Sequence, residues 1–161
     1  MKRVVVTGIG TISPLGNSRE EVVNGMKNSE CGIGEITLYD TSDRLVKLAA
    51  EAKDYDPDKY FDKRDQRRLD RVDQFGIIAA RRALEDAGLD REYLSKERVG
   101  VYCASGIGGI QTIENEHTRG MNRSFDRVSP YFIPMAIVNL TAGNIAIDIK
   151  AHGSCQGLVT A

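Results

Sequence analysis

The last five residues of the sequence, Gly157–Ala161, combine a glycine and apolar residues with a small final residue, a pattern typical of a buried strand that ends in a tight turn. In α/β enzymes a nucleophile is usually mounted at the tip of such a strand, where the chain turns into a helix. The sequence therefore indicates that the chain ends at the tip of such a strand, the kind of place where a nucleophile is mounted. No residue within the chain itself is expected to be catalytic.

A group of basic residues indicates a second kind of chemistry, the binding of an anionic partner. Arg64, Arg68 and Arg71 are spaced at i, i+4 and i+7, so a single helix would carry them on one face, with Lys63 and Arg67 beside them. Charge runs of this kind most often form a solvated helix face. From the residues alone the solvated face is favoured, and a partner site is the alternative.

The segment Thr7–Gly10 follows a short β-branched run, as the glycine loop of a dinucleotide-binding site does. The full fingerprint needs a third Gly or Ala three residues on, and Ser13 stands there. Glu30–Gly32 is a poor match for the acidic strand end that should follow. A structural turn is therefore favoured over a NAD site, and a titration with NAD would distinguish them.

The cysteines and histidines form no recognisable reactive or metal-binding pattern. Cys155 follows His152 by three residues, but both fall in a predicted turn rather than at a strand-to-helix junction. Cys103, at the end of a predicted strand, is best explained as a small buried residue. His117 and His152 are expected at the surface or in supporting roles. An odd number of widely spaced cysteines, Cys31, Cys103 and Cys155, argues against disulfides and zinc.

Charge and hydropathy exclude several classes of protein. With 22 basic and 23 acidic residues the net charge is −1, which argues against a nucleic-acid binder that depends on bulk charge. No apolar run approaches the roughly 18 residues of a membrane span, and Val4–Val6 is too short for a signal peptide. With 41% apolar residues the chain can build a packed core. We expect a cytoplasmic protein that binds neither nucleic acid nor membrane.

Alternating strand and helix patterns predict an α/β layered fold with a mixed or parallel sheet. The clearest element is a long helix over residues 65–87, where small and apolar residues recur at helical spacing and Gly88 follows as a stop. Pro134 fits the first turn of another helix. We expect strands at residues 2–6, 46–50, 98–104 and 157–161, helices at 18–27, 65–87, 109–119 and 134–147, a loop at 120–128 and a turn at 150–156.

Several motifs occur in order along the whole chain: Lys2–Gly10 followed by Ser13–Gly16, Lys63–Asp70, Ala83–Leu89, Ser105–Gly109, Ser129–Pro134 and Val138–Gly143. Together with the closing Thr160–Ala161 pair, they resemble the β-ketoacyl-acyl-carrier-protein synthases. The resemblance is closest to the bacterial type II elongating enzymes of the synthase II kind.

This resemblance implies a thiolase-like layered αβαβα fold in a protein that pairs into a tight homodimer. Residues 1–161 would form the N-terminal part of that domain, less than half of it, and would stop just before the nucleophile. The nucleophile would be a cysteine directly after Ala161, with the catalytic histidine pair and lysine well beyond it. The 161 residues alone are expected to be inactive and poorly soluble, because a core sheet would be left uncovered.

The reaction implied is a condensation in fatty acid elongation. An acyl chain would be joined to malonyl-acyl carrier protein with loss of carbon dioxide, giving β-ketoacyl-carrier protein. No metal or redox cofactor is implied, because the carrier protein brings its own phosphopantetheine arm. The alternative is a catalytically silent partner subunit similar to a chain-length factor, in which a residue other than cysteine would follow Ala161.

The resemblance also gives the basic cluster a role. Arg64, Arg67 and Arg68 match positions at which family members dock an acidic acyl carrier protein, and Arg127 is a weaker match. Charge steering of an acidic partner mainly raises the association rate and is sensitive to salt. The partner-site interpretation is strengthened accordingly.

Two apolar residues are assigned to the acyl-chain pocket by the same resemblance. Ile107 matches a residue that lines this pocket, and Phe132 matches one that reaches across the dimer. Ordinary core packing is the alternative, because the sequence does not distinguish an apolar residue that lines a pocket from one that packs in the core. The pocket is the favoured interpretation.

Overall fold

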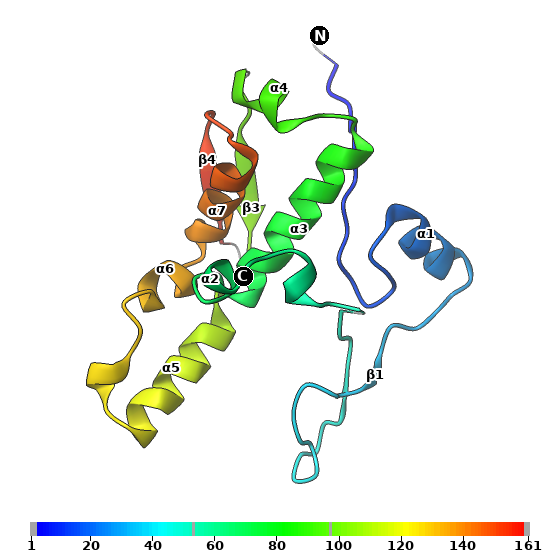
Figure 1. Ribbon diagram of the computed structural model, residues 1–161. Coiled ribbons are helices and arrows are strands. Elements are labelled where there is room, and N and C mark those ends of the chain that lie inside the picture. The colour runs from blue at the N-terminus through cyan, green and yellow to red at the C-terminus, as the bar shows by residue number, and fades with distance from the viewer. Residues whose placement is uncertain (1–2, 53, 97, 160–161) are drawn as a thin grey trace.

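Helices α3 (Arg71–Asp86) and α7 (Asn139–Ile149) pack against each other, and α7 covers a two-stranded sheet of β3 (Val101–Ala104) and β4 (Cys155–Leu158). Figure 1 shows this arrangement in the computed structural model, which describes residues 3–52, 54–96 and 98–159. Apolar side chains from these elements and their neighbours form the core: Phe61, Ile77, Ile78, Leu94, Val101, Ala142, Ile145 and Ile149.

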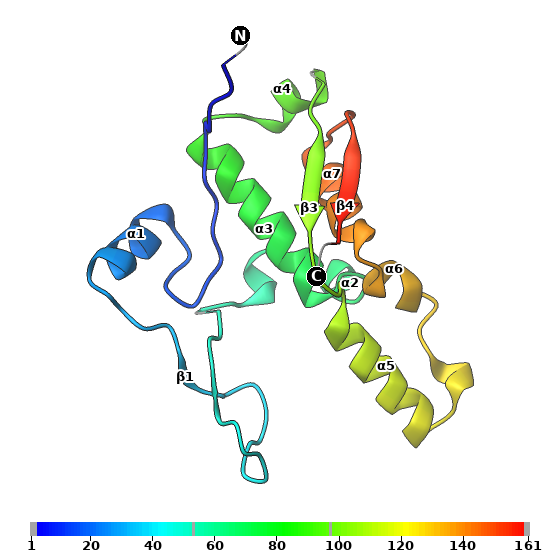
Figure 2. The same ribbon diagram turned by 180° about the vertical axis from the view of Figure 1, so that it is seen from behind.

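Strands β3 and β4 are parallel, with Val101 opposite Cys155 and Ala104 opposite Leu158. Parallel neighbours need a long crossover connection, and here the chain between them includes α5 (Ile110–Asn122), α6 (Phe132–Ala136) and α7. Figure 2 shows the other face of the two strands, with no helix of the described chain in front of it. Tyr102 is accordingly 62% exposed. The expected α/β fold with a parallel sheet is confirmed.

Helix α1 (Arg19–Lys27) begins where local signals place it. The Ser18 side chain accepts a hydrogen bond from the Glu21 N–H, and the Glu21 carboxylate accepts one from the Ser18 N–H in return. Backbone N–H groups of Asn17 and Ser18 lower the pKa of Glu21. Four further elements are β1 (Gly34–Glu35) and β2 (Leu48–Ala49), which pair antiparallel, the 3-10 helix η1 (Pro57–Lys59) and α4 (Arg91–Lys96).

The prediction of one helix over residues 65–87 is wrong, because the structure has two helices there. A short helix α2 (Lys63–Gln66) is capped by Asp62, and α3 starts anew at Arg71. Asp70 has an extended backbone (φ −65°, ψ 162°), and its side chain caps the start of α3. A helix that comes from α2 cannot continue through a residue with this backbone conformation. The predicted single face of Arg64, Arg68 and Arg71 therefore does not exist. Gly88, at φ +65°, does stop α3 as expected.

Of the predicted strand at residues 2–6, residues 3–6 form no strand, because they pair with no other described strand, and Lys2 lies outside the described residues. Val4 is 93% exposed. A strand forms only where a neighbour exchanges hydrogen bonds with it. Gly8 and Gly10 instead lie directly against backbone carbonyls of α3, where a side chain would not fit. They serve as close-packing residues beside a helix rather than as a loop at a helix N-terminus, which favours the structural interpretation of this turn.

Residues 134–147 form parts of two helices rather than one. Helix α6 (Phe132–Ala136) holds Pro134 in its first turn, as predicted, but Ile137 is extended (ψ 138°) and separates α6 from α7. Strand β4 begins at Cys155, inside the predicted turn 150–156, because its parallel register with β3 extends that far. Thr160 and Ala161, at the end of the predicted strand, lie outside the described residues.

Between the sheet strands, helix α5 (Ile110–Asn122) runs three residues beyond the predicted end at Arg119. The predicted loop 120–128 contains a 3-10 helix, η2 (Phe125–Arg127), which packs back on α5. Gly120 allows this packing, because a Cβ at this position would lie 2.5 Å from the nearest atom of the Phe125 ring. None of the helices in the described ranges is long and apolar enough to span a membrane.

Candidate functional site

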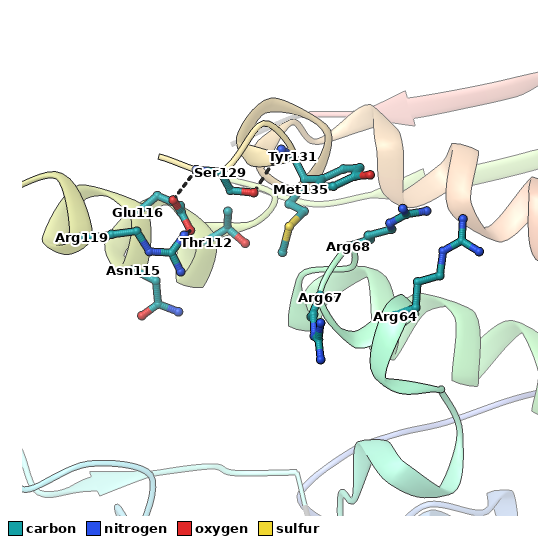
Figure 3. A pocket seen from close by; sticks show the side chains of 10 residues that line it. All are labelled: Arg64, Arg67, Arg68, Thr112, Asn115, Glu116, Arg119, Ser129, Tyr131 and Met135. Atoms are coloured by element: carbon teal, nitrogen blue, oxygen red, sulfur yellow. Dashed lines mark hydrogen bonds and ion pairs between the residues drawn. The ribbon is translucent and has the colours of Figure 1, made fainter. Parts of the chain in front are cut away.

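An open cavity of about 750 Å³ lies between helix α2 with its following turn, helix α5, and the segment that leads into α6. Figure 3 shows α5 on one side and the arginines of α2 on the other. The cavity carries four arginines and one glutamate, so its lining is strongly cationic. The residues that line it are Arg64, Arg67, Arg68, Thr112, Asn115, Glu116, Arg119, Ser129, Tyr131 and Met135.

Three predicted docking residues meet in this cavity. Asp62 accepts hydrogen bonds from the N–H groups of Arg64 and Asp65, at 2.8 and 2.7 Å, and so fixes the start of α2. Arg67 is the C-terminal cap of the same helix. The Arg68 guanidinium lies 4.8 Å from the centre of the Tyr131 ring, a cation–π distance.

Two other arginines do not belong to this group. Arg127, the weaker match, lies exposed on η2 and is not among the residues that line the cavity. Arg71 lies past the break between α2 and α3. Its guanidinium is 4.9 Å from the ring centres of both Tyr55 and Phe75. It therefore stabilises a local aromatic contact rather than the cationic surface.

The opposite wall of the cavity contains a charged pair that the sequence analysis missed. Glu116 is buried, with its side chain 9% exposed, and Oε1 pairs with Nη1 of Arg119 at 2.7 Å. Its other oxygen, Oε2, accepts the Ser129 N–H at 2.7 Å. The i, i+3 spacing of Glu116 and Arg119 was visible in the sequence. The position of this pair across the cavity from Arg64, Arg67 and Arg68 was not visible there.

Asp70 connects the two walls of the cavity. Its Oδ1 accepts the Val72 N–H at 3.0 Å and so caps α3. Its Oδ2 accepts both the N–H and the hydroxyl of Thr112, at 2.8 and 2.6 Å, in the first turn of α5. Asp70 is only 4% exposed. Hydrogen bonds to a buried carboxylate are among the stronger ones in proteins, so the start of α3, which directly follows the turn after α2, is tied to the first turn of α5.

A second buried carboxyl group, Asp73, lies beneath the site. Burial raises the pKa of Asp73, although hydrogen bonds from the Thr141 hydroxyl (2.6 Å) and the Asp70 N–H (3.3 Å) favour its charged form. Burial also raises the pKa of the half-buried Cys103 thiol, and the negative charge of Asp73 adds to this effect. A thiol held in its protonated form is a poor nucleophile.

The remaining residues singled out in the sequence lie in the turn after β3, at the start of α6 and in β4. Ile107, in the turn after β3, is 58% exposed, so it is not a core residue of this chain. Phe132 is partly buried at the start of α6. The two segments adjoin, because the Gly109 N–H donates to the Ala136 carbonyl at 3.1 Å. Cys155 lies in a strand rather than at a strand-to-helix turn. The predicted catalytic position after Ala161 is outside the described residues.

Comparison with known proteins gives a consistent result. The family model "Beta-ketoacyl synthase, N-terminal domain" matches residues 1–161. The 3-oxoacyl-[acyl-carrier-protein] synthase 2 of Staphylococcus aureus (strain COL) is 41% identical over 160 residues, which cover 99% of this chain and 39% of that protein. The synthase 2 of a Synechocystis species is 38% identical, with 99% and 38% covered. The chain thus spans less than half the length of these curated relatives.

Solved structures show the same fold. The ishigamide ketosynthase/chain length factor superposes with a TM-score of 0.86 at 24% identity, over 97% of this chain and 39% of that one. The AntDE:AntF complex, a type II polyketide acyl-carrier protein with its ketosynthase, gives a TM-score of 0.76 at 26% identity, over 98% and 41%. The thiolase-like fold expected from the motifs is confirmed, and the chain belongs to the β-ketoacyl synthase family, of which it is an N-terminal domain.

Proposed function

We propose that the protein to which this domain belongs condenses an acyl chain with malonyl-acyl carrier protein in fatty acid elongation. The observation that carries the proposal is the 41% identity to a 3-oxoacyl-[acyl-carrier-protein] synthase 2 across 99% of the chain. The arginine-lined cavity supports it independently, because a carrier protein is an acidic partner and the cavity offers four cations against one carboxylate.

The proposed reaction has two stages. In the first, the thiolate of a cysteine after Ala161 attacks the acyl thioester, and the carrier's phosphopantetheine thiol leaves. In the second, malonyl-carrier protein loses carbon dioxide, and the resulting enolate attacks the enzyme thioester and releases the cysteine. A helix N-terminus after the strand would favour the thiolate. Backbone N–H groups at the same turn would stabilise the oxyanion.

The acyl carrier protein is the proposed partner at the cavity, with Arg64, Arg67 and Arg68 as its first contacts and Arg127 at a distance from them. The described complex of an acyl-carrier protein with its ketosynthase supports a partner of this class. Ile107 and Phe132 are proposed to line the acyl pocket. We propose further that the protein is a cytoplasmic homodimer and needs no cofactor beyond the phosphopantetheine of its substrate.

The test is a reconstituted condensation with the full-length protein. Acyl-carrier protein and malonyl-carrier protein are supplied, and β-ketoacyl-carrier protein and carbon dioxide are measured by mass spectrometry and isotope release. We expect one carbon dioxide per product and complete inhibition by iodoacetamide, with the label on the residue after Ala161. Absence of product, with a residue other than cysteine at that position, would contradict the proposal and indicate a subunit similar to a chain-length factor.

A further inference from the structure

The cavity has a second cationic wall that none of the predicted docking residues belongs to. Arg119 comes from the last turns of α5, across the cavity from Arg64, Arg67 and Arg68 (Figure 3). Its side chain is 46% exposed, so the guanidinium is accessible at the rim. Arg64, Arg67 and Arg68, on α2 and the turn after it, therefore face a fourth arginine across the cavity.

The Arg119 side chain is fixed by contacts with neighbouring residues, although part of it is exposed to solvent. The buried carboxylate of Glu116 binds its Nη1 at 2.7 Å and is itself anchored by the Ser129 N–H. A guanidinium presents five N–H donors in a rigid fork. One pairing with Glu116 leaves other donors of that fork available for an acidic group in the cavity. Glu116 thus orients Arg119 without using up its capacity to bind.

We infer that Arg119 is a further docking residue for the acyl carrier protein, and that Glu116 is the residue that positions it. The inference rests on the proposed function, because it assumes that an acidic carrier protein occupies this cavity. Guanidinium groups on both walls favour a partner that inserts an acidic edge between them, over one that contacts only the wall formed by Arg64, Arg67 and Arg68. Thr112 and Asn115 supply neutral polar groups on the α5 wall.

The matched control is Arg123, four residues further along α5. It is exposed, it caps the end of the same helix, and it does not line the cavity. The variants R119E and R123E change the net charge equally, as do R119Q and R123Q. Any difference within a pair therefore reports position rather than total charge. The glutamine variants guard against misfolding of R119E, in which two glutamates would lie one turn apart.

Binding of fluorescently labelled acyl carrier protein to the full-length variants is measured by anisotropy at low and high salt. We expect affinity to fall about threefold for R119Q and about tenfold for R119E, with both Arg123 variants within about 1.5-fold of the parent protein. At about 0.5 M salt the differences should nearly vanish. Melting temperatures confirm that each variant is folded.

Two outcomes overturn the inference, and they differ from failure of the proposed function. Equal weakening by R119E and R123E, or by neither, shows that Arg119 has no special place in docking. If the charge reversals R64E and R67E still weaken binding in that case, the carrier site stands and only the role of Arg119 is lost. If R64E and R67E also have no effect, the carrier protein does not bind in this cavity at all.

Discussion

The carboxylate of Asp70 caps two helices at once, α3 through Oδ1 and α5 through the N–H and hydroxyl of Thr112. The two residues are 42 positions apart in the sequence. Gly109, at the start of α5, supplies no side-chain cap of its own, so Asp70 takes that role from a distance. The link also fixes how the cavity walls face each other.

Removal of this double cap is expected to destabilise the protein more than removal of an ordinary cap. We expect D70A to lower the free energy of unfolding by about 3 kcal/mol, because a helix cap and two charge-assisted hydrogen bonds are lost in a buried site. Asp62, the exposed cap of the four-residue helix α2, is the control, and D62A should cost about 1 kcal/mol. Urea denaturation measures both, and equal costs would contradict a special role for Asp70.

The buried carboxyl of Asp73 should make stability fall as pH rises. Its pKa is raised in the folded protein above the ordinary value of 3.8, so the folded state keeps a proton that the unfolded state releases. The contribution is fully present below pH 3.8 and is lost as pH rises through the folded pKa. D73N removes this titration. Relative to the parent protein, D73N should gain stability as pH is raised above 3.8; a constant difference between the two would refute the raised pKa.

The turn from β3 into α5 depends on glycine at a defined point. A Cβ on Gly109 would overlap the Met135 carbonyl oxygen and lie 3.0 Å from Oδ2 of Asp70. We expect G109A to cost at least about 2 kcal/mol, because the Met135 backbone must move and the Asp70 side chain must shift slightly. G106A is the control in the same turn, since a Cβ there meets nothing within 4 Å. Thermal unfolding of both variants checks this, and similar melting temperatures would count against the packing described.

Charge reversal on the α2 wall should weaken carrier binding without removing the chemistry. The exposed pair Arg64 and Arg67 is the choice, because Arg68 also stacks on Tyr131. We expect R64E/R67E to raise KM for the carrier substrate at least about tenfold at low salt, with kcat little changed. The control R44E/K47E alters net charge equally at exposed residues that do not line the cavity. A similar KM in both double variants would speak against docking on this wall.

Local signals in the sequence were sufficient for some elements. The Ser18–Glu21 capping box and the stop at Gly88 depend on residues within one turn of each other, so α1 and the end of α3 were predicted correctly. The break at Asp70 was not predicted. The hydrophobic spacing on its two sides continues a helical pattern, and its partner Thr112 is remote in the chain. The N-terminal run Val4–Val6 looked like a strand because its composition is right, but composition does not supply a pairing partner.

The candidate site was predicted in part for the same reason. Arg64, Arg67 and Arg68 line one cavity, as neighbours on one short segment can, and their docking role stays a prediction. Arg71 was wrongly added, because the spacing argument assumed an unbroken helix. The place of Arg119 in the cavity lining was not predicted, because it depends on how α5 packs, which is set by long-range contacts.

Leu69 alone separates Arg68 from Asp70, and Asp70 is bound to Thr112 on the far wall. The distance between Arg68 and the α5 wall that carries Arg119 is therefore fixed by the fold before a partner binds. A partner whose carboxylates match this distance loses little conformational entropy on binding. A partner with the same total charge but a different spacing of carboxylates gains little binding free energy. Discrimination among acidic proteins would then depend on how their charges are spaced as well as on how many charges they carry.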